Sequence, residues 1–368
     1  MPLRRGSQRH RSLAEMIRST NNVWLHRFAC MLAVATLFLV ALGGVVTTKN
    51  VGMAVPDWPT TYGENMFLFP PSKWIGGIFY EHSHRLVASI VGLLTTILAV
   101  WLWLKDCRPR VRWLGVIAFF GVVFQGVLGG LRVVFDKYGL GTELGIFHAT
   151  FAQLFFLLVC SIALFTSKWW TNFSERELDS PFGINLRRFF AVTTFLILVQ
   201  LILGATMRHQ HAGLAVPDFP LAYGKIWPAT DAASLHAYNA HRVETNGEEA
   251  ITAPHIVIHM LHRLTGFAVL LAITACAARS WRQASDTPVR KITTVWLAIA
   301  LVQVALGVLT ILSQRKVDVT TAHVAVGALT FMVGWMLVLM TSRSALGKRS
   351  LAAEPEAILS TSSELKHA

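Results

Sequence analysis

The sequence predicts an all-α integral membrane protein whose eight transmembrane helices form two pseudo-symmetric four-helix bundles. Of its 368 residues, 54% are hydrophobic and only 14% are charged, and the mean hydropathy is +0.50. In addition, the segment 51–63 (VGMAVPDWPTTYG) returns 161 residues later as 212–224 (AGLAVPDFPLAYG), with eight of thirteen positions identical. A repeat this close indicates two copies of one structural unit, so chemistry is expected at equivalent positions in both halves.

Eight apolar stretches are each long enough to cross a hydrocarbon core of roughly 30 Å as a helix. They lie at 24–46, 78–104, 113–132, 142–166, 189–207, 254–278, 292–312 and 319–341. A soluble core could not absorb so many, and a helix satisfies its own backbone polar groups within lipid. The first stretch is too long to be a cleaved signal peptide.

The distribution of lysine and arginine predicts the orientation in the membrane. The segments 1–27, 105–112, 167–188, 279–291 and 342–368 hold 22 of these residues within 97 positions. The alternate segments, 47–80, 132–142, 208–253 and 313–320, hold nine within 99. This excess predicts that both termini are cytoplasmic. The net charge of +13 is then mostly a topology signal, and nucleic acid is not an expected partner.

The spans divide the chain into five predicted segments. These are a basic cytoplasmic tail (1–23), an N-terminal four-helix bundle (24–166), a cytoplasmic linker (167–188), a C-terminal four-helix bundle (189–341) and a cytoplasmic tail expected to be disordered (342–368). Between the two repeats the offset grows by 17 residues, from 161 to 178, so the second outer loop carries an insertion around 229–250. This polar stretch is expected to have little fixed structure. The Pro-Asp segments should be rigid loops, because proline fixes φ.

Four histidines carry the predicted chemistry. His84 matches His262 at an offset of 178, and His148 matches His323 at an offset of 175. All four lie a few residues inside helices that begin on the outer side, and therefore at similar depth. Each bundle thus offers two facing imidazoles, the arrangement that holds a haem by bis-His ligation. The alternatives are histidines that only bridge helices and a zinc site, for which no carboxylate or cysteine cluster completes a tetrahedral set in both halves.

The two halves differ at one position. Where the second half has His259, the first has Glu81, one helical turn before His84. An ionisable group at membrane depth is costly and indicates function. We expect Glu81 to project toward the haem of the first half, which would carry out chemistry while the second half keeps an electron-transfer haem. The alternative is that Glu81 is interfacial and solvated, near a helix start that favours an anion.

Other polar residues lie at the outer boundary. Four arginines lie near this boundary, where haem propionates would emerge: Arg85, Arg263, Arg132 and Arg208. Bidentate pairing with a carboxylate is an expected role for them, with Arg85 and Arg263 as the predicted propionate contacts, and snorkelling to the interface is the alternative. Several histidines of the second outer loop are expected to be solvated or weak metal contacts: His209, His211, His236, His241 and His255.

Together, the paired Pro-Asp-Trp/Phe-Pro loops, Glu81-x-x-His84-Arg85, His259-x-x-His262-Arg263 and the two further histidines resemble the haem A synthase family over about residues 20–342. The resemblance implies oxidation of the C8 methyl group of haem O to the formyl group of haem A, for cytochrome oxidase. It further implies that Glu81 is the catalytic carboxylate and that His84 and His148 flank the substrate haem O. In the C-terminal half it implies a haem b cofactor with His262 and His323 as ligands of its iron.

The resemblance also implies partners and a location. The partners are haem O, the farnesyltransferase that makes it (haem O synthase), an electron acceptor of quinone or ferredoxin type, the cytochrome oxidase assembly machinery and membrane lipid; a homo-oligomer is compatible with it. The location is the cell inner (plasma) membrane, or alternatively the mitochondrial inner membrane. The cysteines fall in spans or on the inner side, so they build no outer-loop disulfide, and the chain resembles the cysteine-poor branch of proteobacteria and mitochondria: Cys30, Cys107, Cys160 and Cys276.

Two other functions fit part of the pattern. A di-haem bis-His membrane cytochrome that exchanges electrons with quinone would share the histidines but would not need Glu81. A transporter with a repeated fold would share the topology but not the paired ligands.

Overall fold

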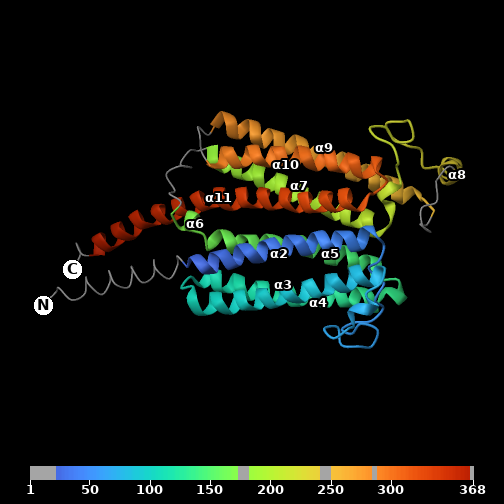
Figure 1. Ribbon diagram of the computed structural model, residues 1–368. Coiled ribbons are helices and arrows are strands. Elements are labelled where there is room, and N and C mark those ends of the chain that lie inside the picture. Colours follow the sequence, from blue (N-terminus) through green and yellow to red (C-terminus); the bar gives the residue numbers. More distant parts are fainter. Residues whose placement is uncertain (1–21, 173–181, 241–249, 284–287, 365–368) are drawn as a thin grey trace.

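The chain is described by a computed structural model that covers residues 22–172, 182–240, 250–283 and 288–364 (Figure 1). The predicted tail 1–23 lies almost wholly outside these residues. Within them the chain is nearly all helical, and eight helices are long and apolar enough to cross a membrane. This confirms the predicted all-α membrane fold with eight spans. Two isolated β-bridges, Thr61–Glu64 and Ala222–Lys225, lie outside the helices.

The N-terminal half consists of four helices, α2 (Val23–Thr48), α3 (Gly77–Lys105), α4 (Pro109–Val134) and α5 (Gly141–Phe165). Each helix packs against the next, and α5 returns to α2, so the four form a closed ring. The side chain of Asn22 caps α2 by accepting hydrogen bonds from the backbone N–H groups of Trp24 and Leu25, both at 3.1 Å. Proline begins α4, where its missing N–H costs nothing.

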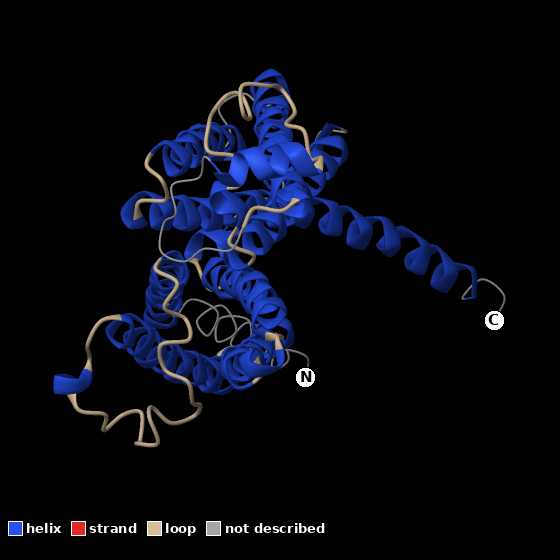
Figure 2. Ribbon diagram, turned by 90° about the vertical axis from the view of Figure 1, so that its right-hand side faces the viewer, coloured by secondary structure: helices blue, strands red, loops and turns tan. Residues whose placement is uncertain are grey.

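The C-terminal half repeats this ring with α7 (Phe182–His209), α9 (Ala253–Gln283), α10 (Pro288–Leu312) and α11 (Val317–Glu364). Figure 2, which looks along the helices from the end that carries the long loops, shows the two helix groups side by side. α11 extends well past its membrane span, which ends at Ser342. It therefore includes most of the residues for which a disordered tail was expected.

Short helices lie in the connections. They are η1 (Pro71–Lys73), η2 (Asp136–Tyr138), α6 (Lys168–Asn172), η4 (Ala212–Leu214) and α8 (Ala232–Ala240). α8 corrects the expectation of little fixed structure for 229–250, of which 241–249 lie outside the described residues. Tyr238 stacks on Tyr223 with ring centroids 3.6 Å apart. The side chain of Asn239 accepts a hydrogen bond from the Ile251 N–H (2.8 Å) and donates one to the Ile251 carbonyl (3.0 Å). These contacts to neighbouring loop segments fix a helix that the polar local sequence does not predict.

The two halves pack through α2 and α5 on one side and α7 and α11 on the other. Phe156, Cys160 and Ala328 form an apolar cluster in this interface. The indole of Trp335 donates a hydrogen bond to the Ser161 hydroxyl at 2.8 Å, joining α11 to α5. None of the four cysteines, all of which lie within the described residues, forms a disulfide.

Packing differs between the two ends of each ring. Large apolar side chains fill the end away from the Pro-Asp loops, which is the predicted inner end, among them Leu32, Leu98 and Ile162 in one half and Phe190, Trp296 and Leu337 in the other. At the opposite end, the predicted outer end, glycines, histidines and apolar side chains line a cavity.

Candidate functional site

One continuous cavity of about 810 Å³ runs through the outer parts of both rings. This volume is typical of a cofactor or small-molecule site, which spans roughly 300–1,000 Å³. All four predicted histidine ligands line it, together with Glu81 and the Pro-Asp loops. The repeat therefore brings the predicted site residues of both halves to one cavity.

In the N-terminal half, His84 of α3 and His148 of α5 are close enough to interact electrostatically. Each ring lies against a glycine of a neighbouring helix. A Cβ atom at Gly43 of α2 would lie 3.2 Å from Cε1 of His84, and one at Gly129 of α4 would lie 3.1 Å from Cε1 of His148. The Nδ1 atoms of both histidines are buried without a hydrogen bond. The glycines thus leave room for two imidazoles whose nitrogens have no hydrogen-bond partner among the described residues.

The C-terminal half repeats this arrangement. His262 of α9 and His323 of α11 interact electrostatically, and Cβ atoms at Gly204 and Gly307 would each lie 3.0 Å from the Cε1 atom of one ring. The offsets from Gly43 to Gly204 and from Gly129 to Gly307 are again 161 and 178. Sequence reasoning missed these glycines, although the repeat offsets could have identified them.

Glutamine side chains distinguish the two pairs. The Gln200 amide nitrogen lies 3.2 Å from Nε2 of His262, and that of Gln303 lies 3.4 Å from Nε2 of His323. In the first half Gln125 donates to the backbone carbonyl of His148 at 2.9 Å, and so bridges two helices. Position 39, the equivalent of Gln200, is leucine. Sequence reasoning missed Gln200 because the repeat does not mark it.

This donor set fits a haem better than a bare metal ion. Among the described residues, no group of three or more His, Cys, Asp or Glu side chains could hold a metal ion. A haem iron needs only two axial ligands, because the porphyrin supplies the other four. Two imidazoles from opposite helices of an apolar cavity meet that need.

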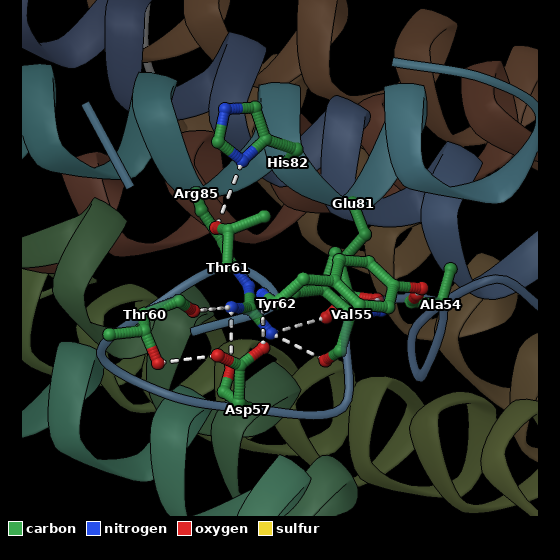
Figure 3. Close-up of polar contacts among 9 residues, drawn as sticks. All are labelled: Ala54, Val55, Asp57, Thr60, Thr61, Tyr62, Glu81, His82 and Arg85. Carbon is green, nitrogen blue, oxygen red and sulfur yellow. Dashed lines mark hydrogen bonds and ion pairs between the residues drawn. The ribbon is translucent and has the colours of Figure 1, made fainter. Parts of the chain in front are cut away.

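Glu81 lies in the cavity wall with its carboxylate held at both oxygens (Figure 3). It is 4% exposed. One oxygen accepts a hydrogen bond from the Val55 N–H at 2.8 Å, and the other forms an ion pair with Arg85 at 2.8 Å. Glu81 is therefore not the solvated interfacial residue of the alternative interpretation. At the equivalent position of the other half, Nδ1 of His259 lies 3.2 Å from the Ala212 carbonyl.

Arg85 binds the first Pro-Asp loop. Besides its ion pair with Glu81, its guanidinium donates hydrogen bonds to the carbonyls of Val55 (2.9 Å), Asp57 (2.7 Å) and Thr60 (3.1 Å). Arg263 likewise donates to three carbonyls of the second loop, those of Val216, Asp218 and Leu221. This arrangement favours a role in holding the loops over the predicted propionate contacts of both arginines.

An aspartate organises each loop from within. Asp57 accepts hydrogen bonds from the Tyr62 N–H (2.7 Å), the Gly63 N–H (2.8 Å) and the Thr60 hydroxyl. Burial raises the pKa of the Asp57 carboxyl, but these hydrogen bonds outweigh burial and hold its pKa below the usual range. In the second loop Asp218 accepts from the N–H groups of Tyr223 (2.8 Å) and Gly224 (3.1 Å).

The backbone turns the same way in both loops. Tyr62 and Tyr223 have φ values of 52° and 51°, each followed by a glycine at positive φ. Each tyrosine hydroxyl donates back to its own loop, to the Ala54 carbonyl at 2.6 Å and the Ala215 carbonyl at 2.8 Å. The two loops, which were predicted to be rigid, thus share the same backbone conformation and the same internal hydrogen bonds at these positions.

The structure separates the outer-loop histidines. His211 and His236 are exposed, as expected, His255 is half-buried, and His241 lies outside the described residues. The prediction for His209 is wrong, because this residue is 9% exposed and contacts Gly145 of the other half. Its burial depends on the packing of α7 against α5, which the local sequence does not reveal.

Comparison with known proteins agrees with this site. The model of the COX15-CtaA family, described as cytochrome oxidase assembly protein, matches residues 72–334. Three of the similar curated proteins are each named Heme A synthase. That of Shouchella clausii (strain KSM-K16) is 29% identical over 221 residues, covering 59% of this chain and 70% of the relative. That of Geobacillus kaustophilus (strain HTA426) is 26% identical over 325 residues, covering 86% and 91%. That of Bacillus cereus (strain 03BB102) is 27% identical over 342 residues, covering 89% and 98%.

Proposed function

The chain belongs to the COX15-CtaA family of cytochrome oxidase assembly proteins, and we propose that it is a haem A synthase. It is a multi-pass membrane oxidoreductase that oxidises the C8 methyl group of haem O to the formyl group of haem A, for cytochrome oxidase. The observation that carries this proposal is an asymmetry. Two equivalent histidine pairs face one cavity, and within the part of the chain that the structure describes only the N-terminal pair has a buried carboxylate beside it.

In this proposal, haem O binds as substrate in the N-terminal half. His84 and His148 lie on either side of it, in the space left by Gly43 and Gly129. Glu81 is the catalytic carboxylate. Conversion of a methyl into a formyl group removes electrons in stages, which pass to the electron acceptor. The first stage gives an alcohol and the second a geminal diol, the hydrate of the aldehyde, which loses water to leave the formyl group. A carboxylate held at the cavity wall can accept a proton or stabilise positive charge that develops next to the ring.

Arg85 and the first loop act as positioning elements. Arg85 and the Val55 N–H each hold one oxygen of Glu81, and Arg85 is itself fixed by three loop carbonyls. The carboxylate therefore cannot swing out to the surface without breaking contacts with the loop. Such preorganisation is what electrostatic catalysis requires.

The C-terminal half would hold haem b through His262 and His323. This group supplies a bis-His iron that exchanges single electrons. The backbone carbonyl of Gln303, 3.1 Å from Nδ1 of His323, would orient that ring. The side-chain amides of Gln200 and Gln303 lie at Nε2 of His262 and His323 and would move aside when these atoms bind iron. His259 occupies the position of Glu81, so this half has no carboxylate at that position.

From the family and the fold we also infer the source of the substrate, the electron acceptor and the membrane in which the protein works. Haem O comes from its farnesyltransferase, and the electrons pass to an acceptor of quinone or ferredoxin type. The plasma membrane is the expected location, because the relatives are bacterial. The excess of lysine and arginine supports cytoplasmic termini.

The wild-type protein tests this function directly. It is expressed in a bacterium that makes haem O but not haem A, and extracted haems are analysed as pyridine haemochromes. We expect haem A in the membranes, and haem b with haem O or A in the purified protein. Haem b alone would instead support a di-haem cytochrome, and a protein without haem would support a transporter.

A further inference from the structure

Arg132 lies at the outer end of α4, where the two halves meet. Its side chain lines the large cavity and also a second, polar cavity of about 130 Å³. Its guanidinium packs under the first Pro-Asp loop, so that a Cβ atom at Gly52 would lie 2.9 Å from one of its terminal nitrogens. Arg132 is therefore placed between the proposed substrate site and the outer surface.

This arginine has no hydrogen-bond partner among the described residues, and its Nε atom is fully buried. A buried donor left unpaired is costly, and a buried charge more so. Arg85 and Arg263 differ from it, because loop carbonyls use their terminal N–H groups. An unpaired guanidinium that faces a ligand cavity points to an anionic ligand.

The surroundings of Arg132 come from both halves. A Cβ atom at Gly145 of α5 would lie 3.1 Å from Nε of Arg132 and 2.8 Å from the ring of His209, which belongs to α7. Arg208, also of α7, lines both cavities as well. Glu81 and Asp136 are the acidic groups that act on Arg132, but Glu81 is paired with Arg85 and Asp136 is exposed.

The two arginines have matching positions relative to the histidine pairs. Arg132 follows Gly129, which contacts His148, by three residues, and Arg208 follows Gly204, which contacts His262, by four. Each arginine thus lies about one helical turn outward of the imidazole level of its own half. The repeat equivalents of the arginines are Thr310 and Thr47, which also line the cavity. Each half therefore has one arginine and one threonine at this level. The helix that carries the arginine in one half is equivalent to the helix that carries the threonine in the other.

We propose that Arg132 and Arg208 bind the carboxylates of haem propionates, Arg132 in the N-terminal half and Arg208 in the C-terminal half. This inference rests on the proposed function, because it requires haem in both halves. A planar guanidinium binds a carboxylate through two parallel hydrogen bonds. Arg208 uses one terminal nitrogen for the Gly44 carbonyl (2.8 Å) and the Thr48 hydroxyl (3.2 Å) of α2. Its other terminal nitrogen and its Nε atom have no hydrogen-bond partner among the described residues and are left for a carboxylate.

The test compares iron protoporphyrin IX with its dimethyl ester, which has the same ring but no carboxylates. Both are titrated into the full-length protein, and the N-terminal component is defined as the absorbance change that is lost in His84→Ala. We expect Arg132→Met to weaken binding of the free acid about tenfold or more, since a hydrogen bond to a charged group has about that effect. Binding of the ester should change little, and Arg132→Lys should fall between.

Lys137→Met is the matched control, because it removes a neighbouring exposed cation that lines neither cavity. It should keep the preference for the free acid. The inference is overturned if Arg132→Met keeps that preference, or if Lys137→Met loses it equally. Unchanged ester binding and retained haem b absorbance report that the variants are folded. If the wild type shows no component that depends on His84, the proposed substrate site fails as well.

Discussion

At the scale of single residues, the site depends on glycines as much as on histidines. Each of the four rings lies within 3.2 Å of the place where a glycine of the next helix would carry a Cβ atom. This closeness limits how far the rings can move and leaves the cavity open between them. An added methyl group would force the ring to move by a few tenths of an ångström.

Gly129→Ala tests this contact. The new Cβ would lie 3.1 Å from Cε1 of His148, so we expect haem to bind the N-terminal half about tenfold more weakly, a cost in the usual range for overpacking. Alanine favours helix over glycine by about 1 kcal/mol, so the fold should persist. Gly121→Ala on the same helix is the control, because its Cβ would meet Phe155 at an ordinary 3.4 Å. Equal haem affinity in both variants would mean that the contact between Gly129 and His148 does not affect haem binding.

Substitutions of the histidines test the two proposed haem sites separately. His262→Ala or His323→Ala should remove one axial ligand and lower haem b content, while haem O still binds the other half. His84→Ala is the reciprocal control and should keep haem b. Optical spectra and haem content of the purified variants measure both effects. Unchanged spectra in the two C-terminal variants would mean that these residues are not the ligands.

At the scale of elements, each Pro-Asp loop is a separate unit fastened to its own half by an arginine and an internal aspartate. The loop of the first half also holds Glu81 through the Val55 N–H. In that half alone, therefore, a change in the structure of the loop also changes the position of the Glu81 carboxylate.

Asp57→Asn should loosen the first loop and leave the second unchanged, and Asp218→Asn should do the reverse. The measurement is hydrogen–deuterium exchange of the peptides that span 51–63 and 212–224. An asparagine keeps the shape but loses the negative charge that strengthens hydrogen bonds from three donors. Both loops responding to either change, or neither, would contradict this independence.

The same aspartate sets the pH response of the loop. The pKa of Asp57 is lowered in the folded protein, so its contribution to stability is complete above the unfolded pKa of about 3.9. This contribution is lost as the pH falls through the lower, folded pKa. Exchange of the wild-type loop, corrected for intrinsic rates, should therefore stay constant from neutral pH to about pH 5.

At the scale of the whole molecule, bilayer thickness and the internal repeat made most of the fold predictable. A helix must cross the hydrocarbon core, so apolar length alone located the eight spans. The repeat then paired the histidines and isolated Glu81. Contacts between segments far apart in sequence were not predictable. His209 is buried where α7 meets α5, and α8 is held by contacts that include Tyr223 and Ile251.

The roles of the arginines were beyond sequence reasoning for the same reason. Arg85 binds carbonyls that precede it by 25 to 30 residues, and hydropathy contains no signal for such bonds. Arg132 and Arg208 lie on different helices of different halves and meet the same polar cavity only in the folded molecule. Position near the outer boundary predicted propionate contacts for all four arginines. Only the packing separates the two arginines that hold the loops from the two that line the polar cavity.

The central claim is that the N-terminal half performs the oxidation and that the charge of Glu81 assists it. The most direct measurement is pyridine-haemochrome analysis of purified Glu81→Gln protein from cells that supply haem O. Glutamine keeps the size of the side chain and an acceptor for Arg85 but removes the charge. We predict protein that retains haem b and haem O and yields no haem A, with hydroxylated haem O as the furthest product. A near-normal yield of haem A would contradict the claim, and loss of haem b together with haem A would assign Glu81 a structural role.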